Sequence, residues 1–220
     1  MNKESILIVV AAEVEAEAIR HHMASQITGC EVIVTGVGGI NMAWALQKRL
    51  ASGPLPRLVI NAGIAGTYLP TIKKGDVVLA ASDCFADLGI DDNGSFKTLF
   101  TVGLANPDLF PFKCGRIYCN NQWLEKLKGT FQLVDAATVN MASGSDEIIA
   151  RIKSEWNPAI ETMEGAYFAY VCSMAGVPYI CLRAISNSVE PRNVKNWDIP
   201  AALNSLSEAF KIVLELIEEK

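Results

Sequence analysis

The sequence predicts an α/β fold in a single domain over residues 1–220. Two observations carry this prediction. Apolar runs of strand length, such as residues 6–12 and 179–185, are continuous rather than alternating, which is typical of strands buried on both faces of a sheet. Helical patterns separate these runs, and half of the residues are apolar, so a chain of this length can bury a sizeable core.

Charge and hydropathy exclude several classes of protein. The net charge is −5 and the lysines and arginines are scattered, so no nucleic-acid partner is expected. The uncharged stretch 165–182 approaches the length of a membrane span, but Gly176 and Pro178 interrupt it. We expect a buried helix followed by a buried strand, without a membrane partner. Residues 1–4 do not begin a signal peptide, so the expected compartment is the cytoplasm.

Neither the cysteines nor the histidines form a metal-binding pattern. The six cysteines include no C-x-x-C pair, which favours reduced structural thiols. His21 and His22 are adjacent on a presumptive helix and could not bind one metal together. We therefore expect no metal and no other cofactor, and any proton chemistry falls to carboxylates.

The helix predicted after the first strand carries three glutamates in different settings. Glu13 and Glu17 share one face with Arg20 by helical spacing, which indicates a solvated stripe. Glu15 lies on another face with Ile19, where the helix is expected to pack on the sheet. Desolvation strengthens a carboxylate as a base, so Glu15 is the glutamate predicted to be functional.

Two glycine-rich segments follow predicted strands. Residues 36–39 turn the strand 31–35 into a helix, but Asn41 occupies the third glycine position, so the dinucleotide fingerprint fails. Residues 62–66 follow the strand 57–61 and are predicted to form a second loop. In open α/β sheets ligands bind at this edge, so both segments are expected to line one crevice.

Glu164 stands at the head of the uncharged stretch, where a carboxylate is unexpected. An unpaired charge in an apolar interior is expensive, so this side chain must be paired, hydrogen-bonded or used. From the local sequence two interpretations stay open. The carboxylate either stabilises the N-terminus of the following helix or takes part in function.

The section 96–113 has the weakest pattern in the chain. Pro107 and Pro111 interrupt it, which predicts a mobile or intersubunit loop. The preceding segment 84–92 is expected to be irregular edge structure that closes in a hairpin turn at residues 93–94, an Asn-Gly pair.

Three motifs resemble those of the nucleoside phosphorylase/nucleosidase superfamily: N-A-G-I-A-G at 61–66, T-M-E-G-A at 162–166 and R-A-I-S-N at 183–187. Glu15 and the turn 35–41 fit as well, so the similarity runs from the first strand to the last helix. The resemblance implies a three-layer α/β/α domain whose mixed central sheet partly closes into a barrel. It also implies an active site at the carboxyl edge of that sheet and a homo-oligomer, a dimer or larger.

The bacterial methylthioadenosine/adenosylhomocysteine nucleosidases are a similar branch of this superfamily. By that resemblance Glu15 activates water and Glu164 binds the ribose hydroxyls. The branch ends its R-A-I-S-D motif with an aspartate that protonates adenine, whereas this chain has Asn187. The remaining residues expected to bind the substrate are Ile64, Val139, Asn140, Met141, Ala142 and Met163.

The asparagine at position 187 determines which purine base the substrate is expected to carry. Its amide offers two donors, which suit N7 and O6 of a 6-oxopurine, but it cannot act as a Brønsted acid. The leaving base would therefore be stabilised by hydrogen bonds as charge develops on it. Residues 183–193 and 84–92 also resemble the futalosine hydrolase branch, which implies release of hypoxanthine from futalosine for menaquinone biosynthesis.

Three alternatives remain. A nucleosidase that acts on adenine nucleosides would use Glu15 and Glu164 in the same way. A phosphorylase needs a phosphate pocket, yet Ile64 offers no hydroxyl and Arg20 and Arg57 are expected at the surface, which favours water as the nucleophile. A non-catalytic nucleoside-binding protein could share the fold, because fold does not determine function.

Overall fold

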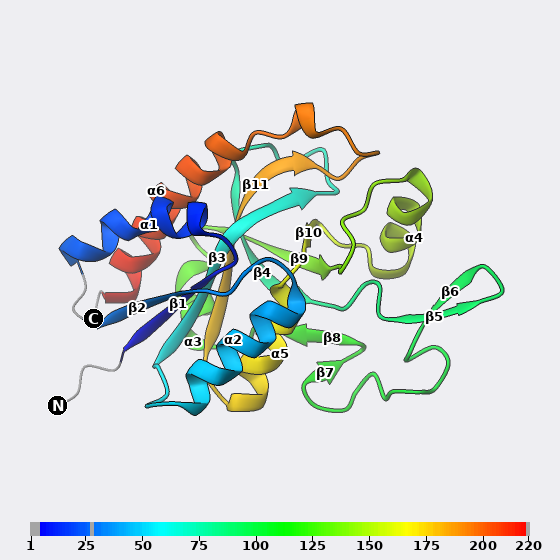
Figure 1. Ribbon diagram of the computed structural model, residues 1–220, viewed down its shortest axis with the longest axis horizontal. Coiled ribbons are helices and arrows are strands. Elements are labelled where there is room, and N and C mark those ends of the chain that lie inside the picture. Colours follow the sequence, from blue (N-terminus) through cyan, green and yellow to red (C-terminus); the bar gives the residue numbers. More distant parts are fainter. Residues whose placement is uncertain (1–4, 27–28, 219–220) are drawn as a thin grey trace.

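The computed structural model describes residues 5–26 and 29–218. Residues 1–4, where no signal peptide is expected to begin, and residues 27–28 and 219–220 lie outside those ranges. Within the described residues, nine strands form one mixed sheet with helices packed on both faces (Figure 1). This arrangement confirms the three-layer α/β/α fold class.

Helices and strands alternate along much of the chain, and most of them begin within a few residues of the predicted positions. The helices are α1 (Glu13–Gln26), α2 (Gly39–Ala51), α3 (Gln122–Leu127), α4 (Asp146–Trp156), α5 (Gly165–Ala175), the 3-10 helix η1 (Val194–Asn196) and α6 (Ile199–Glu218). The strands are β1 (Ile6–Val10), β2 (Cys30–Val34), β3 (Leu58–Thr67), β4 (Val77–Asp83), β5 (Gly89–Asp92), β6 (Ser95–Thr98), β7 (Phe112–Lys113), β8 (Arg116–Tyr118), β9 (Gln132–Thr138), β10 (Ile160–Thr162) and β11 (Tyr179–Ser188).

Five strands of the large sheet close into a ring. Strand β3 pairs with β10, β10 with β9, β9 with β4, β4 with β11, and β11 pairs again with β3. The pairs β3–β10 and β4–β11 are antiparallel and the other three are parallel. Strands β1 and β2 extend the sheet beyond β3, and β8 and β7 extend it beyond β4. The partly closed barrel expected from the resemblance is therefore present.

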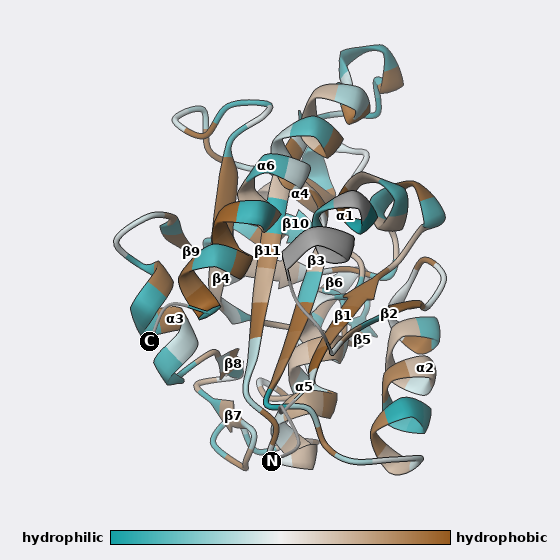
Figure 2. Ribbon diagram, turned by 90° about the vertical axis from the view of Figure 1, so that its left-hand side faces the viewer, coloured by the Kyte–Doolittle hydropathy of each residue, from teal (hydrophilic) through white to brown (hydrophobic). Residues whose placement is uncertain are grey.

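The two helical layers cover the strands on opposite faces. Helices α1 and α6 pack together on one face, and α2 and α5 pack together on the other (Figure 1). The strands between them are strongly apolar (Figure 2), and every residue of β1 is buried. The uncharged stretch forms α5 and the first part of β11, as predicted. None of the helices in the described ranges is long and apolar enough to cross a membrane.

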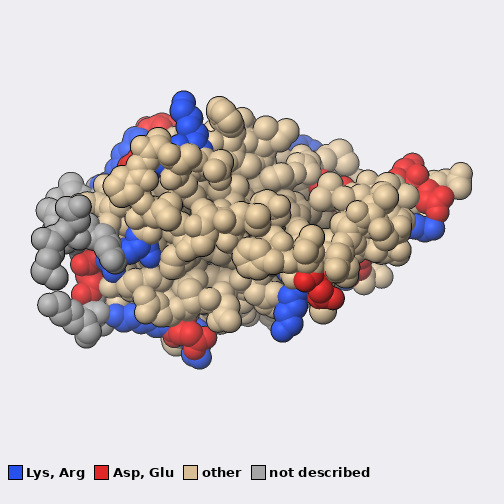
Figure 3. Space-filling model, turned by 90° about the horizontal axis from the view of Figure 1, so that it is seen from below, with Lys and Arg blue, Asp and Glu red and all other residues tan. Residues whose placement is uncertain are grey.

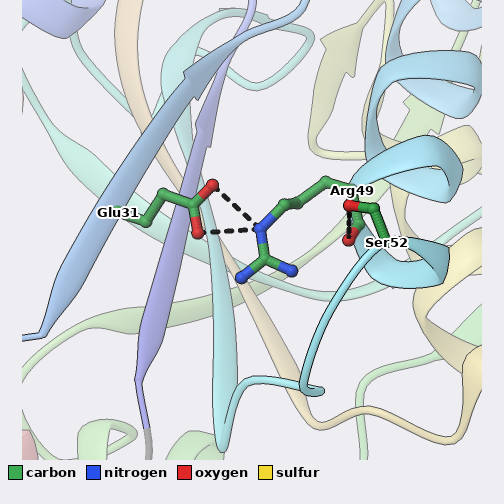
Figure 4. A network of polar contacts seen from close by, with 3 residues as sticks. All are labelled: Glu31, Arg49 and Ser52. Carbon is green, nitrogen blue, oxygen red and sulfur yellow. Dashed lines mark hydrogen bonds and ion pairs between the residues drawn. The ribbon is translucent and has the colours of Figure 1, made fainter.

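An ion pair joins the edge strand β2 to helix α2. Arg49 Nε donates to both carboxylate oxygens of Glu31, at 2.8 and 2.7 Å, and Ser52 Oγ donates to the Arg49 carbonyl at the end of the helix (Figure 4). The contact links the edge strand to helix α2, and so it fixes the edge of the sheet against the α2–α5 layer.

The prediction of a second glycine-rich loop at residues 62–66 is wrong. Residues 62–66 continue strand β3 without a break, and they pair with β11 along one edge and with β10 at Gly66. Glycine signals a turn in many sequences, but it also marks strands that other groups approach closely. Here Gly63 and Gly66 lie directly beside side chains of the candidate site.

The segment between β4 and β8 contains the predicted hairpin. Strands β5 and β6 are joined by Asn93 and Gly94, both at positive φ (54° and 84°), as a two-residue turn requires. Residues 99–111 follow as a series of turns, and Phe112 packs against the core. Whether this segment is mobile or contacts another subunit stays a prediction.

Candidate active site

Glu15 is buried at the point where β1 passes into α1. Its Oε2 accepts from the N–H groups of Ala11 and Ala12 at 2.9 and 3.0 Å, and its Oε1 accepts from Ile64 N–H at 3.1 Å. Only 6% of the residue is exposed, whereas Glu13 and Glu17 face solvent, as predicted. The backbone donors replace water around the carboxylate and hold it over strand β3.

Gly63 lies directly beneath this carboxylate. A Cβ atom at position 63 would lie 2.8 Å from Glu15 Oε1 and 3.6 Å from Arg183 Nη1. A glycine in β3 therefore leaves the space in which a carboxylate from α1 and a guanidinium from β11 meet.

Arg183 is a functional candidate that the sequence reasoning missed. The residue is 2% exposed, and its guanidinium donates to the Asn61 and Leu182 carbonyls at 3.0 Å and to Asn61 Oδ1. A buried cation in an apolar strand has to be paired or used, by the same rule that singled out Glu164. That rule, applied to the predicted strand 179–185, could have found it.

Glu164 projects from the start of α5 to the glycine-rich turn before α2. Its Oε1 accepts from Gly38 N–H at 2.7 Å, so this turn holds a carboxylate of the protein itself. Burial raises the pKa of the Glu164 carboxyl, and the negative charge of Glu15 adds to the rise, while Gly38 N–H and Arg183 oppose it. The two glutamates and the arginine therefore share one electrostatic environment.

The first turn of α5 is capped by threonines instead of by Glu164. Glu164 occupies the N-cap position without a side-chain hydrogen bond to that helix. Gly165 N–H donates to Thr162 Oγ1 at 3.2 Å and Ala166 N–H to Thr138 Oγ1 at 2.8 Å. Glu164 therefore makes no capping hydrogen bond to its own helix, although its charge lies at the N-terminus that the helix dipole favours, and its side chain is turned toward the other candidate groups.

Asn187 lies within strand β11, not after it as predicted. A bulge between Ile185 and Asn187 shifts the register and sets Asn187 opposite Gly66 of β3. Ser186 Oγ donates to Asn187 Oδ1 at 2.8 Å, and Asn187 Nδ2 donates to the Ser188 carbonyl at 2.8 Å. These contacts orient the amide and leave one of its two N–H groups for another acceptor.

The segment expected to flank the base follows β9. Val139 is buried, and its N–H donates to the Thr162 carbonyl at 2.9 Å, which places it beside Met163. Met141 is 64% exposed, and Ala142 is half-buried.

Asp87, which the sequence reasoning did not single out, holds the next part of that segment. Its carboxylate accepts from Asn140 N–H at 2.6 Å, from Asn140 Nδ2 at 2.9 Å and from Met141 N–H at 3.4 Å. Tyr167, three residues after Glu164, donates its hydroxyl to Asn140 Oδ1 at 3.0 Å. Helix α5 and the base-flanking segment are thus tied together.

An apolar groove of about 780 Å³ begins beside Tyr167. Phe85 and Phe112 line the groove, whereas Phe96 does not. Phe96 instead stacks under the Arg151 guanidinium, 4.0 Å from its ring centre. Other lining residues are Ile40, Trp44, Leu88 and Tyr170.

Residues 9–218 match the family profile described as the Phosphorylase superfamily. The chain belongs to this superfamily. It is 30% identical over 191 residues to the futalosine hydrolase of Thermus thermophilus (85% of this chain, 82% of the relative) and 31% identical over 231 residues to that of Acidothermus cellulolyticus (94% and 88%).

A solved structure of the superfamily supports the same fold. The 5′-methylthioadenosine/S-adenosylhomocysteine nucleosidase from S. pneumoniae, with the transition-state inhibitor MT-ImmA, superposes with a TM-score of 0.81 at 19% identity, over 97% of this chain and all of that one. Together these findings confirm the superfamily, the fold and the N-glycosyl hydrolase class of enzyme expected from the sequence.

We expect Gly63→Ala to reduce nucleoside hydrolysis without unfolding this superfamily member. The new methyl group would displace the Glu15 carboxylate, and a displacement of about 1 Å costs on the order of 100-fold in rate. Gly129→Ala is the matched control, because a Cβ there meets no atom within 4 Å. Steady-state kinetics and thermal unfolding of both variants test this, and an unchanged kcat in Gly63→Ala would contradict the placement of Glu15.

Proposed function

We propose that this protein hydrolyses the N-glycosidic bond of futalosine, releasing hypoxanthine and dehypoxanthinylfutalosine for menaquinone biosynthesis. The observation that carries the proposal is an asparagine amide, oriented by Ser186 and Ser188, at the carboxyl end of the strand that also holds Arg183. The remaining N–H group of this amide can donate to N7 or O6 of a 6-oxopurine, and an amide cannot protonate adenine. Three relatives named futalosine hydrolase, at 25–31% identity, support the same substrate.

In the proposed reaction Glu15 acts on water. A carboxylate held by backbone N–H groups on both oxygens is fixed in direction, so it can orient a water molecule and take its proton. Cleavage passes through a transition state with positive charge on the ribose, as in glycoside hydrolysis generally. Glu164 binds the 2′- and 3′-hydroxyls and places negative charge beside that cation. Asn187 donates a hydrogen bond to the purine base as it leaves.

Water is the proposed nucleophile, not phosphate. Arg20 is paired with Glu13 and Arg57 with Glu218 at the surface, as the sequence predicts, so neither guanidinium is directed toward Glu164. The Gly38 N–H that could bind an anion already donates to Glu164.

The apolar groove is the proposed site of the substrate's aromatic 5′ group. It begins at Tyr167, next to the residues assigned to the ribose, and aromatic rings dominate its lining. Phe85 packs edge-on against Tyr167 with ring centroids 4.8 Å apart, and Phe112 packs against Phe85 at 6.2 Å.

The same face is the proposed contact with a second copy of the chain. Seen from the α2–α5 side, charged side chains lie mainly at the rim of the molecule (Figure 3). Ile40, Trp44 and Met174 are 80%, 70% and 55% exposed, which is unusual for side chains of this size on a free surface. A homo-oligomer would cover them and close the groove.

The cysteines are free thiols, which suits the proposed cytoplasmic location.

A panel of nucleosides tests the activity. We expect release of free base from futalosine, little from inosine or methylthioadenosine, and equal rates with and without phosphate. Chromatography of the free base gives the rates. Preference for methylthioadenosine would instead indicate an adenine-directed nucleosidase, and a phosphate requirement would indicate a phosphorylase. Tight nucleoside binding without turnover would indicate a binding protein.

Asn187→Asp should shift the preference from 6-oxopurine toward adenine nucleosides by about tenfold or more, because an unmatched buried polar pair costs roughly 1–3 kcal/mol. The ratio of kcat/KM for the two bases measures this. Asn193→Asp makes the same change in the exposed loop that caps η1 and should leave the ratio unaltered. An unaltered ratio in Asn187→Asp would contradict the role of the amide.

Trp44→Asp should convert the assembled protein to a monomer, since it places a charge in the uncharged face. Sedimentation velocity on the wild-type protein and the variant measures the change. Val194→Asp alters another exposed apolar side chain, 55% exposed and away from α2 and α5, and should not affect assembly. A monomeric wild-type protein at micromolar concentration would refute this interface.

A further inference from the structure

We propose that Asp83, Thr138 and Thr162 form a capping chain that positions Glu164. The two threonines cap helix α5 from the sheet and Asp83 holds Thr138, which releases the Glu164 carboxylate for the ribose. The inference rests on the proposed role of Glu164 and assigns a task to three residues outside the substrate contacts.

The hydrogen bonds of the capping chain all run in one direction. Thr138 Oγ1 donates to Asp83 Oδ1 at 3.0 Å, and this oxygen also accepts from Cys84 N–H at 2.8 Å. Thr138 has a single hydroxyl proton, so at its 3.0 Å contact with Thr162 the Thr162 hydroxyl is the donor. The α5 N–H groups of Gly165 and Ala166 then donate to the two threonine oxygens.

This arrangement replaces the usual N-cap. An N-cap side chain normally accepts from the second or third N–H of its own helix. Glu164 occupies that position, but its Oε1 accepts from Gly38 N–H, at the N-terminus of the neighbouring helix α2. Because strands β9 and β10 supply the acceptors for α5, Glu164 can bridge two helix N-termini without leaving the α5 donors unpaired.

Asp83 anchors the chain beneath the first turn of α5. Its side chain is buried, and Oδ2 has no hydrogen-bond partner in the described ranges. Oδ2 lies against Gly165, where an added Cβ would collide with it. A carboxyl oxygen at this place is favoured by the helix dipole. Burial raises the pKa of Asp83 to about 6, opposed by the Thr138 hydroxyl, Arg116, Cys84 N–H and Arg183.

Kinetics on futalosine and its 3′-deoxy analogue test the inference. Thr138→Val removes the hydroxyl and should lower kcat/KM for futalosine about 10- to 100-fold, as expected for a misplaced catalytic group. Asp83→Asn places an amide NH2 group instead of Oδ2 beside the N-terminus of α5, where the helix dipole disfavours it, and should lower kcat/KM in the same direction. The loss should be much smaller for the 3′-deoxy analogue, since Glu164 has less to bind there. An equal loss on both substrates would overturn the inference.

Two control variants separate positioning from stability. Thr138→Ser keeps the hydroxyl and should retain kcat/KM within about twofold. Tyr179→Phe removes a buried hydroxyl that donates to the Tyr118 carbonyl at 3.2 Å, at the end of β11 opposite to Asn187, and should leave kcat/KM unchanged. A loss in Thr138→Ser as large as that in Thr138→Val would overturn the role of the hydroxyl.

Amide hydrogen exchange gives a readout that needs no substrate. In Thr138→Val and Asp83→Asn the N–H groups of Gly165, Ala166 and Gly38 should exchange faster, the last because it donates to Glu164. Unchanged protection at Gly38 would overturn the inference. If the wild-type protein cleaves neither substrate, the proposed function fails, and the exchange at Gly38 alone decides whether the capping chain positions Glu164.

Discussion

Strand β3 carries no side chain at the two places where the functional groups meet. The Glu15 carboxylate lies over Gly63 and the Asn187 amide over Gly66, each so close that a methyl group would touch it. The bulge in β11 and the turn from β1 into α1 bring these groups to the strand. With a larger residue at either position, the Glu15 carboxylate or the Asn187 amide would have to move away from strand β3.

The regular part of the fold could be predicted because its signals are local. The five residues of β1 are apolar and fully buried, and the Asn-Gly pair at 93–94 forms the expected hairpin turn. The glycine-rich segment 62–66 predicts a loop because a sequence does not distinguish a glycine needed for bending from one needed for close approach. Only the tertiary contacts with Glu15 and Asn187 make that distinction.

In the candidate site too, some residues have a local sequence signal and others depend on tertiary contacts. Glu15 and Glu164 stand out in the sequence as candidates because a carboxylate in an apolar setting demands an explanation, and Arg183 satisfies the same criterion. The donor for Glu164, Gly38 N–H, has no signature, since every residue but proline has a backbone N–H. Asp83 stands at the end of a strand like many surface aspartates, and it is buried only because α5 lies over it.

The closed ring of β3, β10, β9, β4 and β11 has a consequence for the evolution of substrate choice. Asn187 belongs to the ring and Glu15 bonds to it, so a change in one of its strands disturbs partners on both sides. The apolar groove is built mostly from α2, α5 and the turns after β4 and β6, outside that closure. With the groove as the proposed site of the 5′ group, descendants of one ancestor can exchange the distal substituent while the chemistry at the sugar stays the same.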